Sequence, residues 1–201
     1  YIDTSIQLSD KYRPWYSSRF ANIEEVADYW MKNYNTLKEK TELFTDAFYA
    51  TTLPAEVVEA VAANLTILKS PTIFRQYDGR MWNWEGCGNE YGSCYGSCTH
   101  VWNYAQAIPH LFPKMERTLR ETEFFVSQAK NGHQAFRSAL PIRPIRHNFH
   151  AAADGQLGGI MKVYRDWHIY GNDEWLKLIY HTYRIVLIIA LIRGILKGKV
   201  L

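Results

Sequence analysis

The feature that most constrains the fold is the helical periodicity of residues 22–50, NIEEVADYWMKNYNTLKEKTELFTDAFYA. Apolar side chains recur there every three or four positions, which predicts one long helix with one buried face. Asn22 can cap this helix, and two glutamates lie in its first turn, where the helix dipole favours negative charge. Pro54 opens a second helix that ends near Ser70, so these segments predict a helical hairpin.

Helical patterns continue through most of the remaining chain. Four more helices are expected: one from near Thr99 that Pro109 and Pro113 interrupt, one from Pro113 to Lys130, one from Asp154 to a C-cap at Gly171, and one capped by Asp173. Two long loops, 71–99 and 131–153, separate the helix pairs, and TIFRQYD in the first can form short extended pieces. The predicted fold class is all-α, with helical hairpins arranged as an incomplete toroid whose loops meet at one end.

The first long loop carries unusual chemistry. Residues 81–106 read MWNWEGCGNEYGSCYGSCTHVWNYAQ and hold three tryptophans, two glutamates, a histidine and all three cysteines. Gly, Asn and Ser clusters break regular structure, and this stretch has neither helix nor strand spacing. It therefore predicts a crowded, irregular site rather than a packing element.

The composition disfavours some classes of binding partner. Aromatic residues make up 15% of the 201 residues, and such rings can form core or stack on flat ligands and sugar faces. The net charge is only +3 and the basic residues are scattered, so nucleic acid is not an expected partner. The apolar run IVLIIALI between Arg184 and Arg193 is too short for a membrane span.

The cysteines and the first residues limit other classes. Cys87, Cys94 and Cys98 are odd in number and lack a CxxC pair, which disfavours a disulfide framework. A zinc site from these three alone is the less favoured alternative to small residues in a tight loop, and we expect no metal or cofactor. The N-terminus shows no signal peptide and looks cut from a longer protein. An upstream signal would make the protein periplasmic or secreted, and otherwise it would be cytoplasmic.

The order of several motifs resembles glycoside hydrolase family 116, the β-glycosidases of the non-lysosomal glucosylceramidase type. The matching pieces are WEGCGNEY, HVWNYAQAIPHLF, PKME and VYRDWHIYGND followed by WLKLIY, and together they cover most of residues 70–180. The resemblance implies an (α/α)6 catalytic barrel, of which residues 1–201 would be the N-terminal half. It also implies retaining hydrolysis of β-glycosides, in which one carboxylate attacks the sugar and another protonates the leaving oxygen.

The resemblance assigns roles to individual residues. Glu85 matches the nucleophile, and Glu90 is its rival because the gap in the loop can be placed on either side. The implied substrate-binding residues are Trp84, Glu90, His100, Trp102 and His147, with Trp82 as a further ring that either lines the sugar site or packs in the core. His100 stands where the family has an Asp that holds sugar hydroxyls. Without the resemblance, Glu85 would be expected to cap a helix or to pair with Arg80.

The general acid of the family, an Asp, would lie after the VYRD helix, and no candidate follows it here. We therefore expect the chain alone to be inactive as a truncated hydrolase. The tail HTYRIVLIIALIRGILKGKVL, residues 181–201, departs from the family, and a shift of one nucleotide gives a family-like sequence in its place. We interpret it as out of frame; the alternative is an apolar helix that packs on the core or on a partner.

Two other classes of function stay open. One is a non-catalytic module that binds carbohydrate on its Trp and Tyr rings or acts in helical interactions. The other is a related (α/α)6 enzyme, such as a lyase or an inverting glycosidase, for which a carboxylate separation of roughly 6.5 to 9.5 Å is typical. A glycoside is the expected substrate. Exposed apolar faces left by a missing half-barrel predict self-association.

Overall fold

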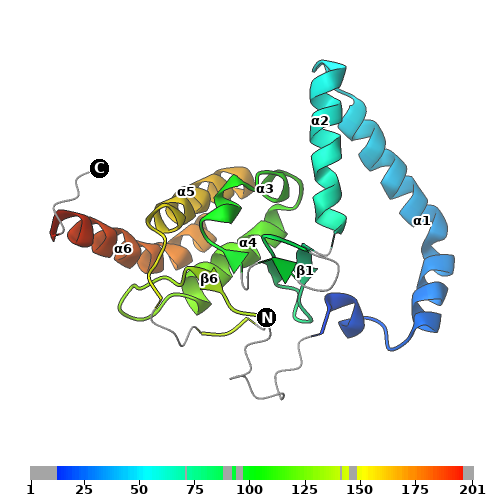
Figure 1. Cartoon of the computed structure of the whole chain (residues 1–201). Coiled ribbons are helices and arrows are strands. Elements are labelled where there is room, and N and C mark those ends of the chain that lie inside the picture. The colour runs from blue at the N-terminus through cyan, green and yellow to red at the C-terminus, as the bar shows by residue number, and fades with distance from the viewer. Residues whose placement is uncertain are drawn as a thin grey trace.

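The computed structural model describes residues 13–70, 72–87, 92–93, 97–140, 142–144 and 149–196; the side chains of residues 86–87, 92–93 and 189–196 are outside this description. Three parts follow one another along the chain in Figure 1: a projecting helical hairpin, a group of short strands, and a helical body. Helices dominate the described residues, which confirms the prediction of a mostly helical chain.

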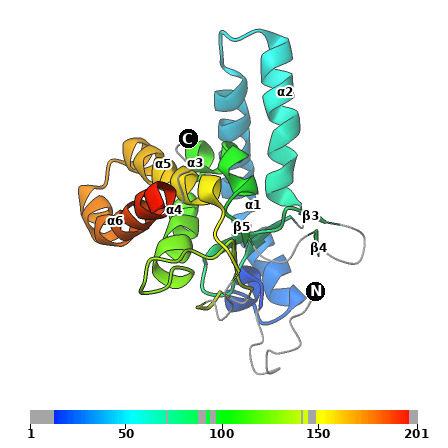
Figure 2. The same cartoon turned by 60° about the vertical axis from the view of Figure 1, so that its left-hand side comes forward.

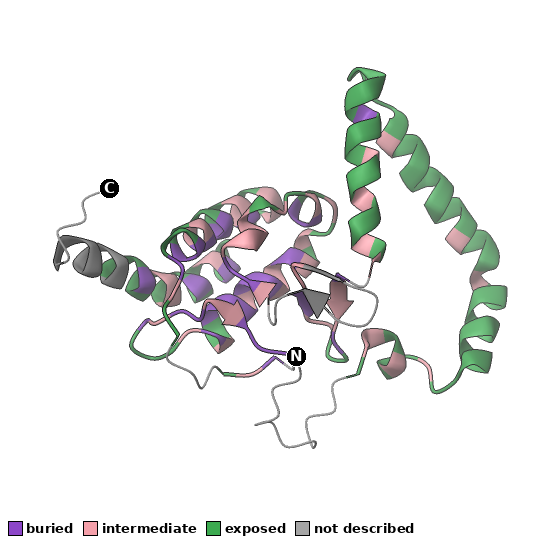
Figure 3. Cartoon of the chain, in the orientation of Figure 1, coloured by how far each residue is buried: buried purple, intermediate pink, exposed green. Residues whose placement is uncertain are grey.

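The hairpin consists of α1 (Ile23–Tyr49) and α2 (Ala55–Leu65), followed by a 3-10 turn, η2 (Thr66–Lys69). The Asn22 cap is confirmed, because its side-chain oxygen accepts a hydrogen bond of 2.9 Å from the backbone N–H of Glu25. The prediction of a buried face on α1 is wrong: none of its residues is buried, and Figure 3 shows it almost entirely exposed. The two helices meet at their turn and diverge toward the body, so α1 has no packed neighbour along most of its length (Figure 1).

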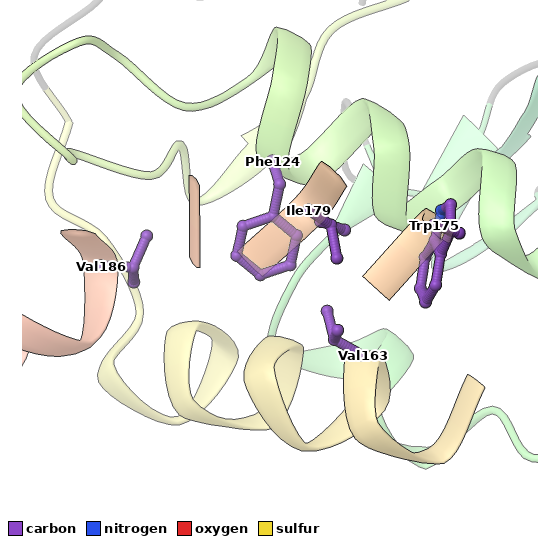
Figure 4. Close-up of a cluster of buried hydrophobic side chains, with 5 residues drawn as sticks. All are labelled: Phe124, Val163, Trp175, Ile179 and Val186. Carbon is purple, nitrogen blue, oxygen red and sulfur yellow. The ribbon is translucent and has the colours of Figure 1, made fainter. Parts of the chain in front are cut away.

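The helical body contains α3 (Ala107–Leu111), α4 (Pro113–Glu121), α5 (Ala153–Tyr170) and α6 (Asp173–Leu196), with the π-helical turn η4 (Thr122–Val126) after α4. The predicted fourth helix therefore ends before Lys130. Helices α5 and α6 form a second hairpin against α4 and η4. Figure 4 shows its core, in which Phe124, Val163, Trp175, Ile179 and Val186 converge.

The junction between α5 and α6 follows the predicted cap at one residue and departs from it at another. Gly171 adopts φ +68°, a left-handed conformation that ends α5 as expected. The cap of α6 is Asn172 rather than Asp173, because the Asn172 side chain accepts the 2.8 Å hydrogen bond from the Trp175 N–H. Asp173 instead accepts a hydrogen bond of 2.8 Å from the indole of Trp167.

The described residues contain six very short strands, which form three antiparallel pairs. The pairs are β1 (Ile73–Arg75) with β2 (Met81–Asn83), β3 (Gly86–Cys87) with β4 (Gly92–Ser93), and β5 (Ser97–Cys98) with β6 (Arg137–Ser138). The extended piece expected in TIFRQYD is confirmed as β1, and the other strands add to the predicted loop. A second core cluster of Trp82, Leu140 and Ile142 lies beneath β2.

Two short 3-10 helices complete the described elements, η1 (Trp15–Ser18) and η3 (Val101–Tyr104). The turn η3 carries the chain from β5 toward α3. Figure 2 places β5 beside the first turns of α5, so the end of the loop and the start of α5 face each other. This junction positions several of the residues predicted from the sequence.

Candidate functional site

Glu85 lies just after β2, where the buried strand emerges toward β3. Its side chain is only 15% exposed and forms an ion pair with Arg137 of β6. Arg80, the alternative partner expected from the sequence, pairs with Asp78 at 2.7 Å instead. A guanidinium beside a carboxylate stabilises its charged form, which is the form that a nucleophile requires.

Cys98 is a second hydrogen-bond partner of Glu85. It lies opposite Arg137 in the β5–β6 pair and is 1% exposed. Burial raises the pKa of its thiol above the ordinary value, and a hydrogen bond to Glu85 acts in the same direction. The thiol is therefore a neutral donor to the carboxylate rather than a reactive thiolate.

His100 follows β5 directly and forms a second polar pair. Its Nδ1 bonds the Asp154 carboxylate at the start of α5, and both side chains are about half exposed, at 45% and 56%. The hydrogen bond with His100 holds the pKa of Asp154 below its usual value. A carboxylate on Nδ1 fixes the orientation of the ring and leaves Nε2 for another group.

Two glycines in the first turns of α5 allow the loop to approach it this closely. A Cβ atom at Gly155 would overlap the side chain of Thr99, and one at Gly158 would overlap that of Asn103. Asn103 in turn donates a hydrogen bond of 3.0 Å to the backbone carbonyl of Asp154. The glycines therefore let η3 pack on α5 and bring His100 to Asp154.

The tryptophans of the loop occupy different environments. Trp82 is completely buried, and its indole N–H donates to the Ser138 carbonyl at 3.2 Å, so it is a core residue. Trp84 packs edge-on against it, with ring centroids 4.5 Å apart. Trp102 is half-buried in η3 and lines a groove between α2 and α3 that Glu85, Trp84 and His100 do not line. Trp84 therefore packs on the core ring Trp82, and Trp102 lines a different part of the structure, the groove between α2 and α3.

Glu90 and His147, the two other predicted site residues, lie outside the described residues, as does Cys94. Their roles stay predictions. Among the residues whose side chains are described, no group of three or more His, Cys, Asp and Glu side chains could hold a metal ion. Within the same part of the chain, the helices are all too short or too polar to cross a membrane.

A buried ionic cluster between α4 and α5 was not predicted from the sequence. Its members are three acids and three bases: Glu116, Arg120, Glu123, Lys162, Arg165 and Asp166. Arg120 is 1% exposed at its centre and contacts all three carboxylates, including Glu116 and Asp166 at 3.5 Å each. The spacing of Glu116, Arg120 and Glu123 at i, i+4 and i+7 was a signal for one polar helix face, but the same spacing is ordinary on solvated helices.

The cluster joins two of the motifs that carry the family resemblance. Glu116 belongs to PKME, and Arg165 and Asp166 belong to VYRD. Arg165 bonds Glu116 at 2.7 Å and Asp166 at 2.8 Å. Burial raises the pKa of Glu116 and Asp166, although the neighbouring arginines oppose this shift. The two motifs therefore form one structural unit inside the body.

Lys162 gives the cluster a measurable pH dependence. Burial, aided by the repulsion of Arg120, lowers the pKa of this lysine to about 8, against 10.5 for the free group. Below pH 8 the lysine is charged in both the folded and the unfolded chain, so the cost of burying its charge is fully present. As pH rises from 8 toward 10.5, the folded chain loses the proton first, and this cost is relieved.

We therefore expect the contribution of Lys162 to the free energy of unfolding to rise by about 2 kcal/mol between pH 7 and pH 9.5. Urea unfolding of the wild type and of Lys162→Met at both pH values isolates this contribution. The stability of the wild type relative to the variant should increase at pH 9.5. A difference that is constant across this range would contradict the lowered pKa.

The sequence was compared with known proteins. No protein-family model matches the chain, and no curated protein sequence matches it significantly.

Proposed function

We propose that the chain belongs to the catalytic domain of a retaining β-glycosidase, with Glu85 as the nucleophile. The observation that carries this proposal is the state of Glu85: a largely buried carboxylate that follows strand β2 and is charge-paired with Arg137 of β6. The motif order WEG, YA, PKME and VYRD supports it. In this proposal the described helices are part of an (α/α)6 barrel, and the hairpins are its successive pairs.

The packing of the motifs gives further support. PKME and VYRD are separated by some fifty positions in the sequence, yet Glu116 and Arg165 form an ion pair of 2.7 Å. Residues that match a family only by chance have no reason to contact one another inside a core. Their contact is what a shared tertiary arrangement would produce.

In the proposed reaction, Glu85 acts as the nucleophile of a retaining mechanism. A carboxylate oxygen of Glu85 attacks the anomeric carbon, the bond to the leaving oxygen breaks, and a glycosyl ester on Glu85 forms. Water then attacks the same carbon, and the carboxylate is released. Arg137 stabilises the resting carboxylate, and the free Nε2 of His100 can bond a sugar hydroxyl. The acid/base Asp that would protonate the leaving oxygen is implied by the resemblance beyond residue 201.

The experiment uses a sugar that needs no acid to leave. A 2,4-dinitrophenyl 2-deoxy-2-fluoro-β-glucoside carries a leaving group that departs without protonation, and the fluorine slows hydrolysis of the ester. Incubation with the chain should add one fluoroglucosyl group, located by peptide mass spectrometry on Glu85. Glu85→Gln should abolish the label because an amide is a poor nucleophile.

The matched control is Asp78→Asn, which removes an exposed carboxylate in the turn between β1 and β2 that pairs with Arg80. The fluorosugar should label Asp78→Asn at the same rate as the wild type. A label found on Glu90 would support the retaining mechanism but identify Glu90, and not Glu85, as the nucleophile. A folded chain that takes up no label would contradict the proposal that it carries a glycosidase nucleophile.

A second candidate, a helical interaction module, is favoured by the exposed apolar side chains of α1 and α2. These include Ile23, Trp30, Leu43, Phe44 and Val61, each at least 47% exposed. A module that binds carbohydrate on tryptophan rings could not use Trp82, because this side chain is fully buried. Binding to another helical surface without labelling by the fluorosugar would favour this candidate.

A further inference from the structure

An apolar groove lies between the hairpin and the body. The groove has a volume of about 920 Å³ and lies between α2 on one side and η3 and α3 on the other. Its apolar lining includes Val57, Val61, Leu65, Trp102 and Leu111. Val57 and Val61 stay 45% and 47% exposed there, so the groove is open to a ligand or a partner.

The hairpin that contributes α2 to the groove is acidic as a whole. Residues 23–65 contain eight Asp and Glu against three Lys, a net charge of −5. Glu56 itself lines the groove, and Glu59 lies on the same helix. An apolar groove on a negatively charged hairpin selects for an apolar segment that carries positive charge.

The opposite end of the molecule carries a segment with this chemistry. After Glu174 the chain has no acidic residue, and residues 175–201 contain five Lys and Arg, a net charge of +5. Helix α6 continues past the core residue Val186 to Leu196. Its described side chains Ile185, Leu187 and Ile188 are 37%, 37% and 48% exposed, so these three apolar residues of α6 are accessible.

The two features cannot meet within one molecule. In Figure 1 the hairpin and the end of α6 extend from opposite sides of the body. Because α6 is one continuous helix anchored by Trp175, Ile179 and Val186, its end cannot turn back to the groove without leaving the core. The groove is therefore available to the α6 end of a second copy.

We propose that residues 181–201 are the apolar helix that packs on a partner, the alternative to an out-of-frame tail, and that the C-terminal half of α6 from one copy docks in the groove between α2 and α3 of another copy. Apolar side chains around Ile185 and Ile188 cover the valines of α2, and the basic tail lies against the acidic hairpin. This mode is an amphipathic helix in a groove. The interface joins two different surfaces, so each copy offers one groove and one tail, and association continues unless reciprocal docking closes a dimer.

The first test is the mass of the complete chain by sedimentation velocity over a range of concentrations. The wild type should associate with increasing concentration. Val61→Glu in the groove and Ile188→Glu in the tail should each weaken self-association at least tenfold. Met161→Glu is the matched control, because Met161 is 73% exposed on α5 outside the groove, and it should associate like the wild type.

The second test distinguishes tail-in-groove docking from other contacts. The Val61→Glu copy keeps a functional tail, and the Ile188→Glu copy keeps a functional groove. A mixture of the two should therefore form a 1:1 complex that does not grow further, although each variant alone is monomeric. A contact between like surfaces would not be restored by mixing.

Circular dichroism of both variants confirms that they are folded, which is expected because both substituted side chains are nearly half exposed. A wild type that stays monomeric at all concentrations would overturn the proposal, as would a mixture that stays monomeric. Neither result depends on Glu85, so fluorosugar labelling and association can fail independently.

Discussion

Replacing Arg120 with Met should cost about 3–5 kcal/mol of unfolding free energy, the range measured when one partner of a buried ion pair is removed. Arg120 is 1% exposed and is the one group that contacts Glu116, Glu123 and Asp166 together. Burial alone would lower its pKa, but the three carboxylates, Glu123 foremost, raise it, so the guanidinium is charged at every accessible pH. Without it, three buried acids face only Lys162 and Arg165.

Chemical unfolding followed by circular dichroism measures this loss. The double variant Arg120→Met with Glu123→Gln removes one charge of each sign, and it should recover part of the stability lost by the single variant. The single variant should also be less destabilised at pH 5 than at pH 8. Its unpaired buried carboxylates bind protons more tightly in the folded chain than in the unfolded one, so stability falls as pH rises. A loss under about 1 kcal/mol would mean that the cluster is not buried as a unit.

Trp82→Ala should cost about 3–5 kcal/mol, since it removes the largest fully buried side chain and leaves a cavity. The ring packs beside Leu140, Ile142 and Trp84, and its indole N–H bonds the Ser138 carbonyl in β6. Because β6 also supplies Arg137, loss of this bond should loosen the partner of Glu85. Reduced labelling by the fluorosugar is expected to accompany the loss of stability.

Two variants separate the contributions of Trp82. Trp82→Phe keeps an aromatic ring but removes the indole N–H that donates to the Ser138 carbonyl. Loss of this hydrogen bond should lower the unfolding free energy by about 1 kcal/mol, and the smaller volume of the Phe ring adds a further loss. Trp84→Ala removes a ring that is only half-buried and should destabilise distinctly less than Trp82→Ala. Equal losses for Trp82→Ala and Trp84→Ala would contradict the assignment of Trp82 to the core.

Local signals in the sequence predicted most of the helices. Asn22 and Gly171 cap α1 and α5 as expected, because each acts through backbone groups within a few residues of itself. The cap of α6 was misplaced by one position, since Asn172 and Asp173 are equally suited to capping and only the course of the chain after Gly171 selects between them. The fourth helix gives way after Glu121 to the π-helical turn η4, where Phe124 enters the core against α5 and α6.

The candidate site was predictable only in part. The family resemblance pointed to Glu85 and His100, but their partners Arg137 and Asp154 lie more than fifty positions away and carry no signal that links them. Nothing in the sequence distinguished the three tryptophans Trp82, Trp84 and Trp102 from one another. Their separation into core, half-buried and groove-lining rings depends on which strand and which turn each one enters.

The sequence by itself determined most of the helices and the caps at Asn22 and Gly171, because caps and apolar spacing act over a few residues. The expectation that residues 81–106 are an irregular segment rather than a packing element is wrong for residues 81–83, which form the buried strand β2 with Trp82 in the core. Only the tertiary structure decided which faces are covered. The periodicity of α1 predicted a buried face that is exposed, and the polar residues of α4 and α5 proved to be buried against one another. Burial is a property of what packs opposite a residue, and that neighbour is distant in the sequence.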